Sequence, residues 1–294
     1  MGMNADQANS SASLFIGVDI GGTTTRIAAF ADLDAPAFTP IARFPTHASY
    51  MEQIRAIERE LSASETVRYA GIGISVGAQI ARDGSGVATA PNLPDYIGKP
   101  LRDECSEHFA SPVRLGHDTV CGLLAEKRFG SLTAFERVAY LTVSTGTGAA
   151  VQLAKDDLSL TFSIEFGHQL LDGNELACLC GQVGCLETMT GGRQIELRYG
   201  QPAERITDLD FWEHLCDTLA LGLVNLAQLT RVEAVAVSGG IYLNNAYLRE
   251  HLPQDVARRL RSLPLQVMVA QLAEDAPLVG AALLSGTPES VILH

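Results

Sequence analysis

Hydrophobic and polar positions along the chain predict strands and helices that alternate through two successive halves. An apolar run at residues 13–18 leads through Gly21-Gly22 into a second apolar run at 26–30, and this pattern predicts a β-hairpin. The same order returns at residues 137–143 and 148–153, again with a glycine-rich turn between the two runs. Two halves that each open with a hairpin indicate a duplicated α/β architecture.

The remaining periodicity divides into helical and extended segments. Apolar residues at helical spacing predict helices at residues 51–61, 101–109, 119–129, 217–229 and 277–284. Short apolar runs predict strands at residues 69–76, 113–115, 234–237 and 265–269. Pro91 and Pro94 predict a loop, because both prolines interrupt regular structure. No helix follows the glycines at 21–22, so this turn is not a dinucleotide-binding fingerprint.

Composition limits the partners that this chain can have. It has 294 residues, of which 47% are hydrophobic and 19% charged, as expected for a globular protein of two medium domains. A net charge of −13 makes nucleic acid a poor partner, because phosphate binding depends on basic patches. No apolar run approaches the roughly 18 residues of a membrane span. Residues 1–12 lack the pattern of a signal peptide, so we expect a cytoplasmic protein with a disordered N-terminal tail.

Three of the six cysteines and one histidine lie close together in the sequence. They are His168, Cys178, Cys180 and Cys185. Three thiolates and one imidazole form a ligand set for a four-coordinate structural zinc ion, which can fix a loop that has no core of its own. The alternatives are a disulfide pair or three unrelated buried thiols. A Cys-x-Cys disulfide is strained, and a reducing compartment disfavours it.

Two carboxylates, Glu165 and Glu187, bracket the cysteine and histidine cluster. A structural zinc site with these ligands does not need them, but they are good hydrogen-bond acceptors for a polyhydroxylated molecule. The sequence therefore predicts a zinc ion that shapes a substrate-binding loop and does not activate water.

Glycine- and threonine-rich turns follow the predicted strands and are candidates for phosphate binding. Glycines let backbone N–H groups approach an anion, and threonine hydroxyls add donors. Hairpin turns use the same residues for backbone reasons, so one such turn alone leaves the ordinary interpretation open. Several together favour a nucleoside triphosphate held between two domains, with Asp19 near a hydrated magnesium ion. The candidate residues are Gly21, Gly22, Thr23, Thr24, Ser144, Thr145, Gly146, Thr147, Gly148, Gly239 and Gly240.

Asp118 stands between a predicted strand and a predicted helix, where a side chain can project into a cleft. A carboxylate there could accept the proton of an attacking hydroxyl in phosphoryl transfer. The alternative is a helix N-cap, a role that suits aspartate well. A histidine in the place of His117, beside it, is more often a packed or solvated residue than a catalyst.

Together these motifs resemble the ROK family of sugar kinases, a branch of the actin-like, ribonuclease H-like ATPases with a duplicated fold and an inter-domain cleft. The resemblance extends from about residue 14 to residue 284. The first phosphate motif is V-D-I-G-G-T at 18–23, the second is V-S-T-G-T-G at 143–148, and the adenosine motif is V-S-G-G at 237–240. The family signature is E-F-G-H at 165–168 with C-L-C-G-Q-V-G-C-L-E at 178–187.

The resemblance implies that the chain uses ATP and Mg²⁺, and a structural Zn²⁺, to phosphorylate a sugar 6-hydroxyl. It implies that Asp118 is the base and that His168 holds both sugar and zinc. The residues implied to contact the sugar are Gly77, Asn92, His117, Asp118, Glu165, His168 and Glu187. The chain departs from the family pattern at Thr24, often lysine there, at His117, usually asparagine, and at Val76, usually proline. With Arg26 and the P-N-L-P loop, these departures favour the allose kinase branch.

Three further expectations concern organisation and function. We expect a smaller domain from residues 13–118 with 278–294, and a larger one from 119–277 that carries the zinc loop. We also expect a homodimer. The competing functions are a sugar-responsive regulator and a sugar-binding protein without turnover. About 13 residues precede the first strand, too few for a helix-turn-helix domain, and Asp19 and Asp118 are retained. Both observations favour the kinase.

Overall fold

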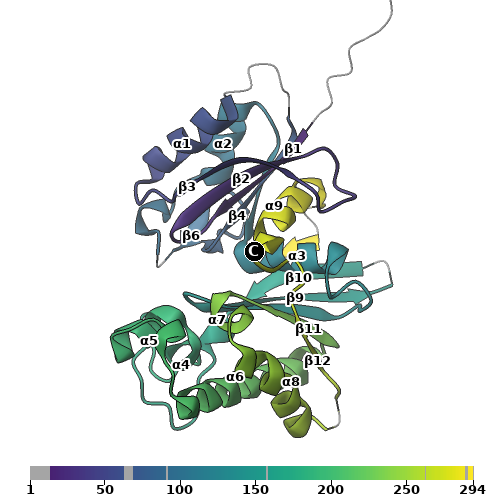
Figure 1. Ribbon diagram of the computed structural model, residues 1–294. Coiled ribbons are helices and arrows are strands. Elements are labelled where there is room, and N and C mark those ends of the chain that lie inside the picture. Colours follow the sequence, from purple (N-terminus) through teal and green to yellow (C-terminus); the bar gives the residue numbers. More distant parts are fainter. Residues whose placement is uncertain are drawn as a thin grey trace, which may run out of the picture.

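A computed structural model describes residues 14–62, 69–90, 92–156, 158–261, 263–288 and 291–293. The predicted disordered tail at residues 1–12 lies outside the described residues, as does Pro91 of the predicted loop. The described chain forms two large sheets, one in each half, with helices on their outer faces and more helices between them (Figure 1).

The first sheet has five strands in the order β3-β2-β1-β4-β7. These are β1 (Leu14–Ile20), β2 (Thr24–Phe30), β3 (Thr39–Pro45), β4 (Tyr69–Val76) and β7 (Val113–His117). Helices α1 (Tyr50–Ser62) and α2 (Leu101–Phe109) bury their apolar stripes against this sheet in one core. Two short strands, β5 (Gln79–Ile80) and β6 (Val87–Thr89), pair with each other beside it.

The second sheet has six strands in the order β12-β11-β8-β9-β10-β13. These are β8 (Val138–Val143), β9 (Thr147–Lys155), β10 (Leu158–Ile164), β11 (Ala234–Ser238), β12 (Gln266–Val269) and β13 (Ile292–Leu293). The helices on its outer side are α4 (Glu187–Thr190), α5 (Gly192–Tyr199), α6 (Leu209–Thr230), α7 (Gly240–Leu243) and α8 (Ala246–Arg259). The long helices α6 and α8 share one core with β8 and β11.

The two sheets repeat one topology. In the first, β1, β2 and β3 form an antiparallel run, and β4 and β7 continue from β1 as parallel strands. In the second, β8, β9 and β10 form the antiparallel run, and β11 and β12 continue from β8 as parallel strands. This repetition confirms the duplicated α/β architecture that the two hairpins predicted.

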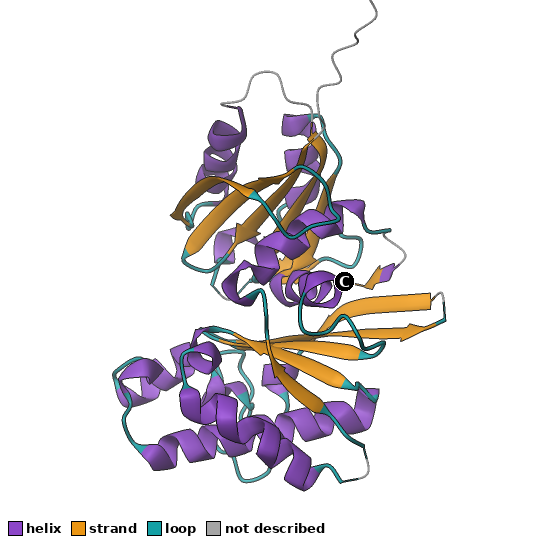
Figure 2. Ribbon diagram, turned by 45° about the vertical axis from the view of Figure 1, so that its right-hand side comes forward, coloured by secondary structure: helices purple, strands orange, loops and turns teal. Residues whose placement is uncertain are grey.

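Helices α3 (Asp118–Phe129) and α9 (Ala276–Gly286) lie between the two sheets and pack against each other (Figure 2). Glycines permit this close packing. A Cβ atom on Gly73 of β4 would lie 1.6 Å from the carbonyl oxygen of Ala281, and one on Gly280 would lie 1.7 Å from that of Cys121. The halves therefore meet through a layer of helices that tolerates no extra side chain at these two positions.

The chain's last described strand belongs to the second half. In β13, Ile292 pairs with Thr161 of β10. The predicted division assigned residues 278–294 to the first domain, and α9 itself contacts both β1 and α3. The exact division between the domains stays a prediction, and α3 with α9 forms the layer that both halves share.

Most predicted elements are present, with differences at their ends. Helix α6 begins at Leu209, not at 217, because Asp208 caps it by accepting a hydrogen bond from the backbone N–H of Asp210. The strands and α-helices that were not predicted are β3, β5, β6, β10, β13, α4, α5, α7 and α8, and α8 contains Pro253 in its interior. Among the described residues, no helix combines the length and the apolar character that a membrane crossing requires.

Candidate active site

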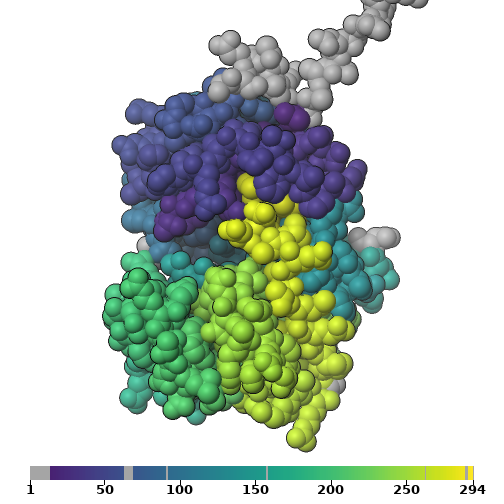
Figure 3. Space-filling view, viewed as in Figure 1, coloured from purple at the N-terminus to yellow at the C-terminus, as the bar shows by residue number. Residues whose placement is uncertain are grey.

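Three neighbouring parallel strands bring polar residues to one edge of the first sheet. Register pairs Val76 of β4 with Ile20 of β1 and with His117 of β7. The polar residues at this edge are Asp19, Ser75, His117 and Asp118. The edge faces the second half, and the surface is hollowed between the part drawn in purple and blue and the part drawn in green (Figure 3). Open α/β sheets commonly bind ligands at the carboxyl ends of parallel strands.

Asp19 is buried and fully engaged by the protein. Its Oδ2 accepts a hydrogen bond from Nη2 of Arg26 at 2.8 Å, and its Oδ1 accepts one from Oγ of Ser75 at 2.9 Å. Burial raises the pKa of Asp19, and Arg26 and Ser75 offset only part of that effect. Since Arg26 neutralises the carboxylate, a hydrated magnesium ion would have to share Asp19 with this ion pair.

His117 and Asp118 are in contact at the end of β7. Nδ1 of His117 lies 2.8 Å from Oδ1 of Asp118. The same Nδ1 also accepts a hydrogen bond from the backbone N–H of Thr119 at 3.2 Å, and Oδ1 otherwise has no hydrogen-bond partner among the described residues. Nδ1 cannot accept from Thr119 and donate to Asp118 at once. The contact with Asp118 is therefore a hydrogen bond only when a proton lies between the two atoms.

His117, and not Asp118, is the N-cap of α3. The interpretation of Asp118 as a helix cap is therefore wrong: Asp118 is the first residue of the helix. Its Oδ2 lies 3.5 Å from the position of a Cβ atom on Gly77, so that oxygen faces the loop after β4. Burial lowers the pKa of His117, but the carboxylates of Asp118 and Glu165 outweigh burial and leave it raised.

The first glycine turn offers only part of its backbone to a ligand. The N–H of Gly21 donates to the carbonyl of Thr24 at 3.0 Å, which closes the turn between β1 and β2. Oγ1 of Thr46 donates to the carbonyl of Gly21 at 2.8 Å. Gly22 and Thr23 are exposed, so their backbone is the part of this turn best placed to meet a phosphate.

The second glycine turn is held by a carboxylate from another segment. The N–H of Thr147 donates to Oε2 of Glu187 at 2.8 Å, and that of Ser144 donates to the carbonyl of Gly146 at 2.9 Å. Thr145 and Gly146 are left to present the turn to a ligand. The predicted sugar residue Glu187 thus lies against the predicted phosphate turn and supports it.

The third predicted motif packs against the second. Gly239 has a φ of 90°, and a Cβ atom there would lie 2.3 Å from the carbonyl oxygen of Val143, the last residue of β8. Only glycine combines this backbone conformation with such close contact. Gly239 and Gly240 therefore lie next to Ser144, as expected if both motifs contact one nucleotide.

Two hydrogen bonds connect the halves across the predicted cleft. Nη1 of Arg193 donates to Oδ1 of Asn92 at 2.6 Å. Nε2 of Gln79 donates to Oε1 of Glu165, while Oε1 of Gln79 accepts from Oγ1 of Thr89. The sequence-predicted residues Asn92 and Glu165 are thus brought to the same gap from opposite sides.

The four predicted metal ligands come together. One potential ligand atom from each of His168, Cys178, Cys180 and Cys185 lies within 4.8 Å of the others. Sγ of Cys180 lies 3.7 Å from that of Cys185, which matches a tetrahedral zinc site with Zn–S bonds of about 2.3 Å. Nδ1 of His168 faces this cluster, 3.9 Å from Sγ of Cys178. Its Nε2 lies on the other side, 3.7 Å from Glu165, so one ring can bind a metal and also meet a sugar.

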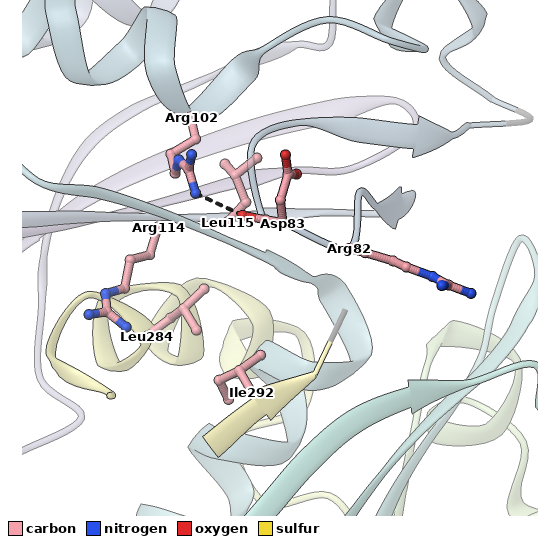
Figure 4. A pocket seen from close by; sticks show the side chains of 8 residues that line it. Arg82, Asp83, Arg102, Arg114, Leu115, Leu284 and Ile292 are labelled. Carbon is pink, nitrogen blue, oxygen red and sulfur yellow. Dashed lines mark hydrogen bonds between the residues drawn. The ribbon is translucent and has the colours of Figure 1, made fainter. Parts of the chain in front are cut away.

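A cavity of about 160 Å³ lies away from these residues. Arg82, Arg102 and Arg114 line it, together with Leu284 of α9 and Ile292 of β13 (Figure 4). Arg102 donates to the carbonyl of Asp83, Arg114 donates to that of Thr287, and Arg82 points away from both (Figure 4). The three guanidinium groups do not converge, so this cavity is not an obvious anion site.

A family model described as ROK family matches residues 15–287. The chain belongs to the ROK family. A glucokinase from Thermotoga maritima is 28% identical over 305 residues, which cover 91% of this chain and 95% of that protein. An N-acetyl-D-glucosamine kinase from Salmonella heidelberg is 29% identical over 275 residues, which cover 82% of this chain and 89% of that protein.

A solved structure of a ROK family glucokinase from Streptomyces griseus, in complex with glucose and AMPPNP, has a TM-score of 0.76 with this chain. It is 24% identical and the match covers 93% of this chain and 99% of that one. This likeness confirms the predicted two-domain, actin-like fold. The relatives' names give no support to the predicted allose kinase branch.

Sequence reasoning missed several residues that hydrogen-bond to the candidate site residues. Ser75 holds Asp19, Gln79 holds Glu165, and Arg193 reaches Asn92. The partners of Gln79 and Arg193 are 86 and 101 positions away, so no local pattern identifies them. Ser75 had a signal, because it lies on the strand next to Asp19 and at the same end.

Proposed function

We propose that this chain transfers the γ-phosphoryl group of ATP to the 6-hydroxyl of a hexose or an N-acetylhexosamine. The observation that carries the proposal is the position of Asp118. Its carboxylate stands at the end of β7, beside Gly77 and at the edge where Asp19 and the first glycine turn also lie. The ROK family membership and the kinase relatives support the same reaction.

In the proposed reaction, Oδ2 of Asp118 accepts the proton of the sugar 6-hydroxyl, and the hydroxyl oxygen forms a bond to the γ-phosphorus. The bond from that phosphorus to the bridging oxygen breaks, and ADP leaves. Gly22, Thr23, Thr145 and Gly146 would hold the phosphates through their backbones. Magnesium, when bound with ATP, would neutralise charge on the phosphate oxygens. Gly239 and Gly240 would contact the nucleoside.

Recognition of the sugar would fall to the residues that flank the gap. The hydroxyl or acyl groups along one edge of the sugar ring would form hydrogen bonds with Glu165, with Nε2 of His168 and with Oε1 of Glu187. A neighbouring hydroxyl would form one with Asn92. A site built to pair with a hydroxyl strongly rejects a sugar that cannot fill it. Since relatives of this chain are named for glucose and N-acetylglucosamine, these sugars come before allose as candidates.

The test is a coupled ADP-release assay with glucose, mannose, allose, N-acetylglucosamine and N-acetylmannosamine. Asp118→Asn should lower turnover on the best sugar roughly a hundredfold or more, the scale of general-base catalysis, with little change in sugar affinity. Near-normal turnover by this variant would remove Asp118 as the base. Sugar binding without ADP release in the wild type would favour a sugar-binding or regulatory protein.

The proposed zinc site makes a separate prediction. The purified protein should contain one zinc ion per chain, measured by native mass spectrometry, and Cys180→Ser should lose it. Cys180 is exposed, so the substitution disturbs no core, and loss of metal should loosen the loop and weaken sugar binding. Buried Cys216, outside the cluster, supplies the matched control Cys216→Ser, which should retain the metal. A metal-free wild type with freely titrating thiols would contradict the site.

A further inference from the structure

Phosphoryl transfer needs positive charge near the transferring group, and the glycine turns supply little of it. Residues 21–30 contain one basic residue, Arg26, and residues 143–154 contain none. Arg26 is already committed, because it donates to Asp19, to Oδ1 of Asp275 and to the carbonyl of Glu274. Apart from the magnesium bound with ATP, a cation that the protein itself brings to the reacting phosphate would have to come from another segment.

Arg193 comes from the first turn of α5, beside the second glycine turn. Its backbone N–H donates to the carbonyl of Thr145 at 2.9 Å, and the N–H of Gly192 before it donates to that of Ser144 at 2.8 Å. The start of α5 is thus tied to the turn between β8 and β9. Wherever that turn holds a phosphate, Arg193 is within reach of it.

The side chain of Arg193 crosses to the first half. It is exposed, and its Nη1 donates to Oδ1 of Asn92 at 2.6 Å. Asn92 in turn lies against the first glycine turn, where a Cβ atom on Gly22 would be 3.7 Å from that of Asn92. The guanidinium group therefore lies between the two turns, the place where the γ-phosphate would lie.

The partner of Arg193 in the structure is a weak one for a guanidinium. Asn92 offers a single neutral amide oxygen, whereas arginine carries five N–H donors in a planar fork. A phosphoryl group accepts two parallel, charge-assisted hydrogen bonds from that fork, which are roughly twice as strong as neutral ones. Ligand binding should move the guanidinium from Asn92 to phosphate and free the Asn92 amide.

Resting on the proposed function, we propose that Arg193 binds the γ-phosphoryl group across the cleft and stabilises its charge during transfer. The second half then supplies the cation that stabilises the transferring phosphoryl group, and the first half supplies Asp118, which activates the attacking hydroxyl. Closure of the cleft and assembly of the charged site become one event, which limits ATP hydrolysis when no sugar is bound.

Two measurements test the role. Arg193→Ala should lower kcat roughly a thousandfold, the lower range for arginines that stabilise phosphoryl transfer, with KM for the sugar changed less than about threefold. Added guanidinium ion should restore part of kcat, which a merely structural role would not allow. Arg193→Lys should stay well below the wild type, because a lysine cannot present the bidentate fork. The matched control is Arg198→Ala at the far end of α5, where Cζ of Arg198 lies 4.8 Å from the centre of the Tyr199 ring. This variant should retain the wild-type kcat.

Nucleotide affinity separates this inference from the proposed function. Arg193→Ala should weaken AMPPNP binding about tenfold and leave ADP binding unchanged, because only AMPPNP has a γ-phosphate. A loss of affinity for AMPPNP but not for ADP would support a contact between Arg193 and the γ-phosphate, whether or not any sugar is phosphorylated. Failure to phosphorylate every sugar tested would count only against the proposed function. Equal loss for both nucleotides, unchanged kcat, or a raised sugar KM at normal kcat would each overturn it, the last by assigning Arg193 to the sugar.

Discussion

The two glycine turns occupy equivalent places in the duplicated sheets, yet they are held in different ways. The turn between β1 and β2 follows a buried carboxylate, Asp19, that is neutralised by Arg26. The turn between β8 and β9 has no charged residue of its own, and Glu187 from α4 accepts the N–H of Thr147. A common topology has placed both turns, and separate polar networks have shaped them.

The two turns are also bonded to different parts of the protein. Arg26 also pairs with Oδ1 of Asp275 at 3.0 Å, just before α9, so the first turn is bound to the helical layer between the halves. The second turn is bound instead to α4 and α5 through Glu187, Thr190 and the backbone of Arg193. We infer that the first network mainly stabilises the fold and that the second mainly shapes the ligand site.

The largest expected effect on stability comes from breaking the first network. Arg26→Ala leaves the buried Asp19 carboxylate without its counter-charge, and should cost about 3 kcal/mol in the free energy of unfolding measured by urea denaturation. Because burial already raises the pKa of Asp19, the deficit should shrink as pH falls and the carboxyl group takes up a proton. Folding raises the pKa of this carboxyl group, so the folded protein loses stability as pH rises through the raised pKa. The variant should therefore show its largest loss of stability above that pKa and a smaller loss below it.

The control lies on the adjacent strand. Arg43 of β3 pairs in register with Arg26 but is exposed, and Arg43→Ala should change stability by less than about 0.5 kcal/mol. Similar losses for both variants would show that the ion pair of Arg26 with Asp19 has no special weight in the first turn.

Breaking the second network should affect the ligand more than the fold. Glu187→Gln keeps an acceptor for the N–H of Thr147 but removes its charge, which is worth about 1 kcal/mol in such a bond. KM for ATP should rise about fivefold, and unfolding should change little. Glu196→Gln on the exposed side of α5 is the matched control. A loss of stability without any change in KM would reverse the roles assigned to the two turns.

The contrast also shows what the sequence could predict. Both hairpins and the His168, Cys178, Cys180 and Cys185 cluster lie in local patterns that hydrophobic periodicity and residue spacing could predict, whereas Asp118 became the favoured candidate for the base only through the resemblance to the ROK family. The networks around the turns depend on partners that folding brings together from afar, since Arg26 and Asp275 are 249 positions apart. Strand β10 did have a local signal that was overlooked, because residues 158–164 alternate apolar and polar side chains in the pattern of a half-buried strand. The domain limits, the homodimer and the cytoplasmic location stay predictions.

The smallest expected effect concerns His117, where the first half meets α3. In His117→Asn, asparagine is also a good N-cap and can accept the N–H of Thr119, which Nδ1 of His117 accepts only when that nitrogen carries no proton. The substitution removes the protonated Nδ1 that donates to Asp118. Since the pKa of His117 is raised in the fold, its contribution to stability is complete below the ordinary histidine pKa and disappears as pH rises through the raised value.

The wild type should therefore be more stable than His117→Asn by up to about 1 kcal/mol below the ordinary histidine pKa, and the difference should shrink as pH rises through the raised pKa of His117. Urea midpoints for both proteins on both sides of that pKa give the measurement. The same variant should shift the ratio of turnover efficiencies among glucose, allose and the N-acetylhexosamines, because the amide and the ring present different groups beside the base. A pH-independent difference in stability would show that His117 acts only as the helix cap. An unchanged ratio would show that its ring faces away from the sugar.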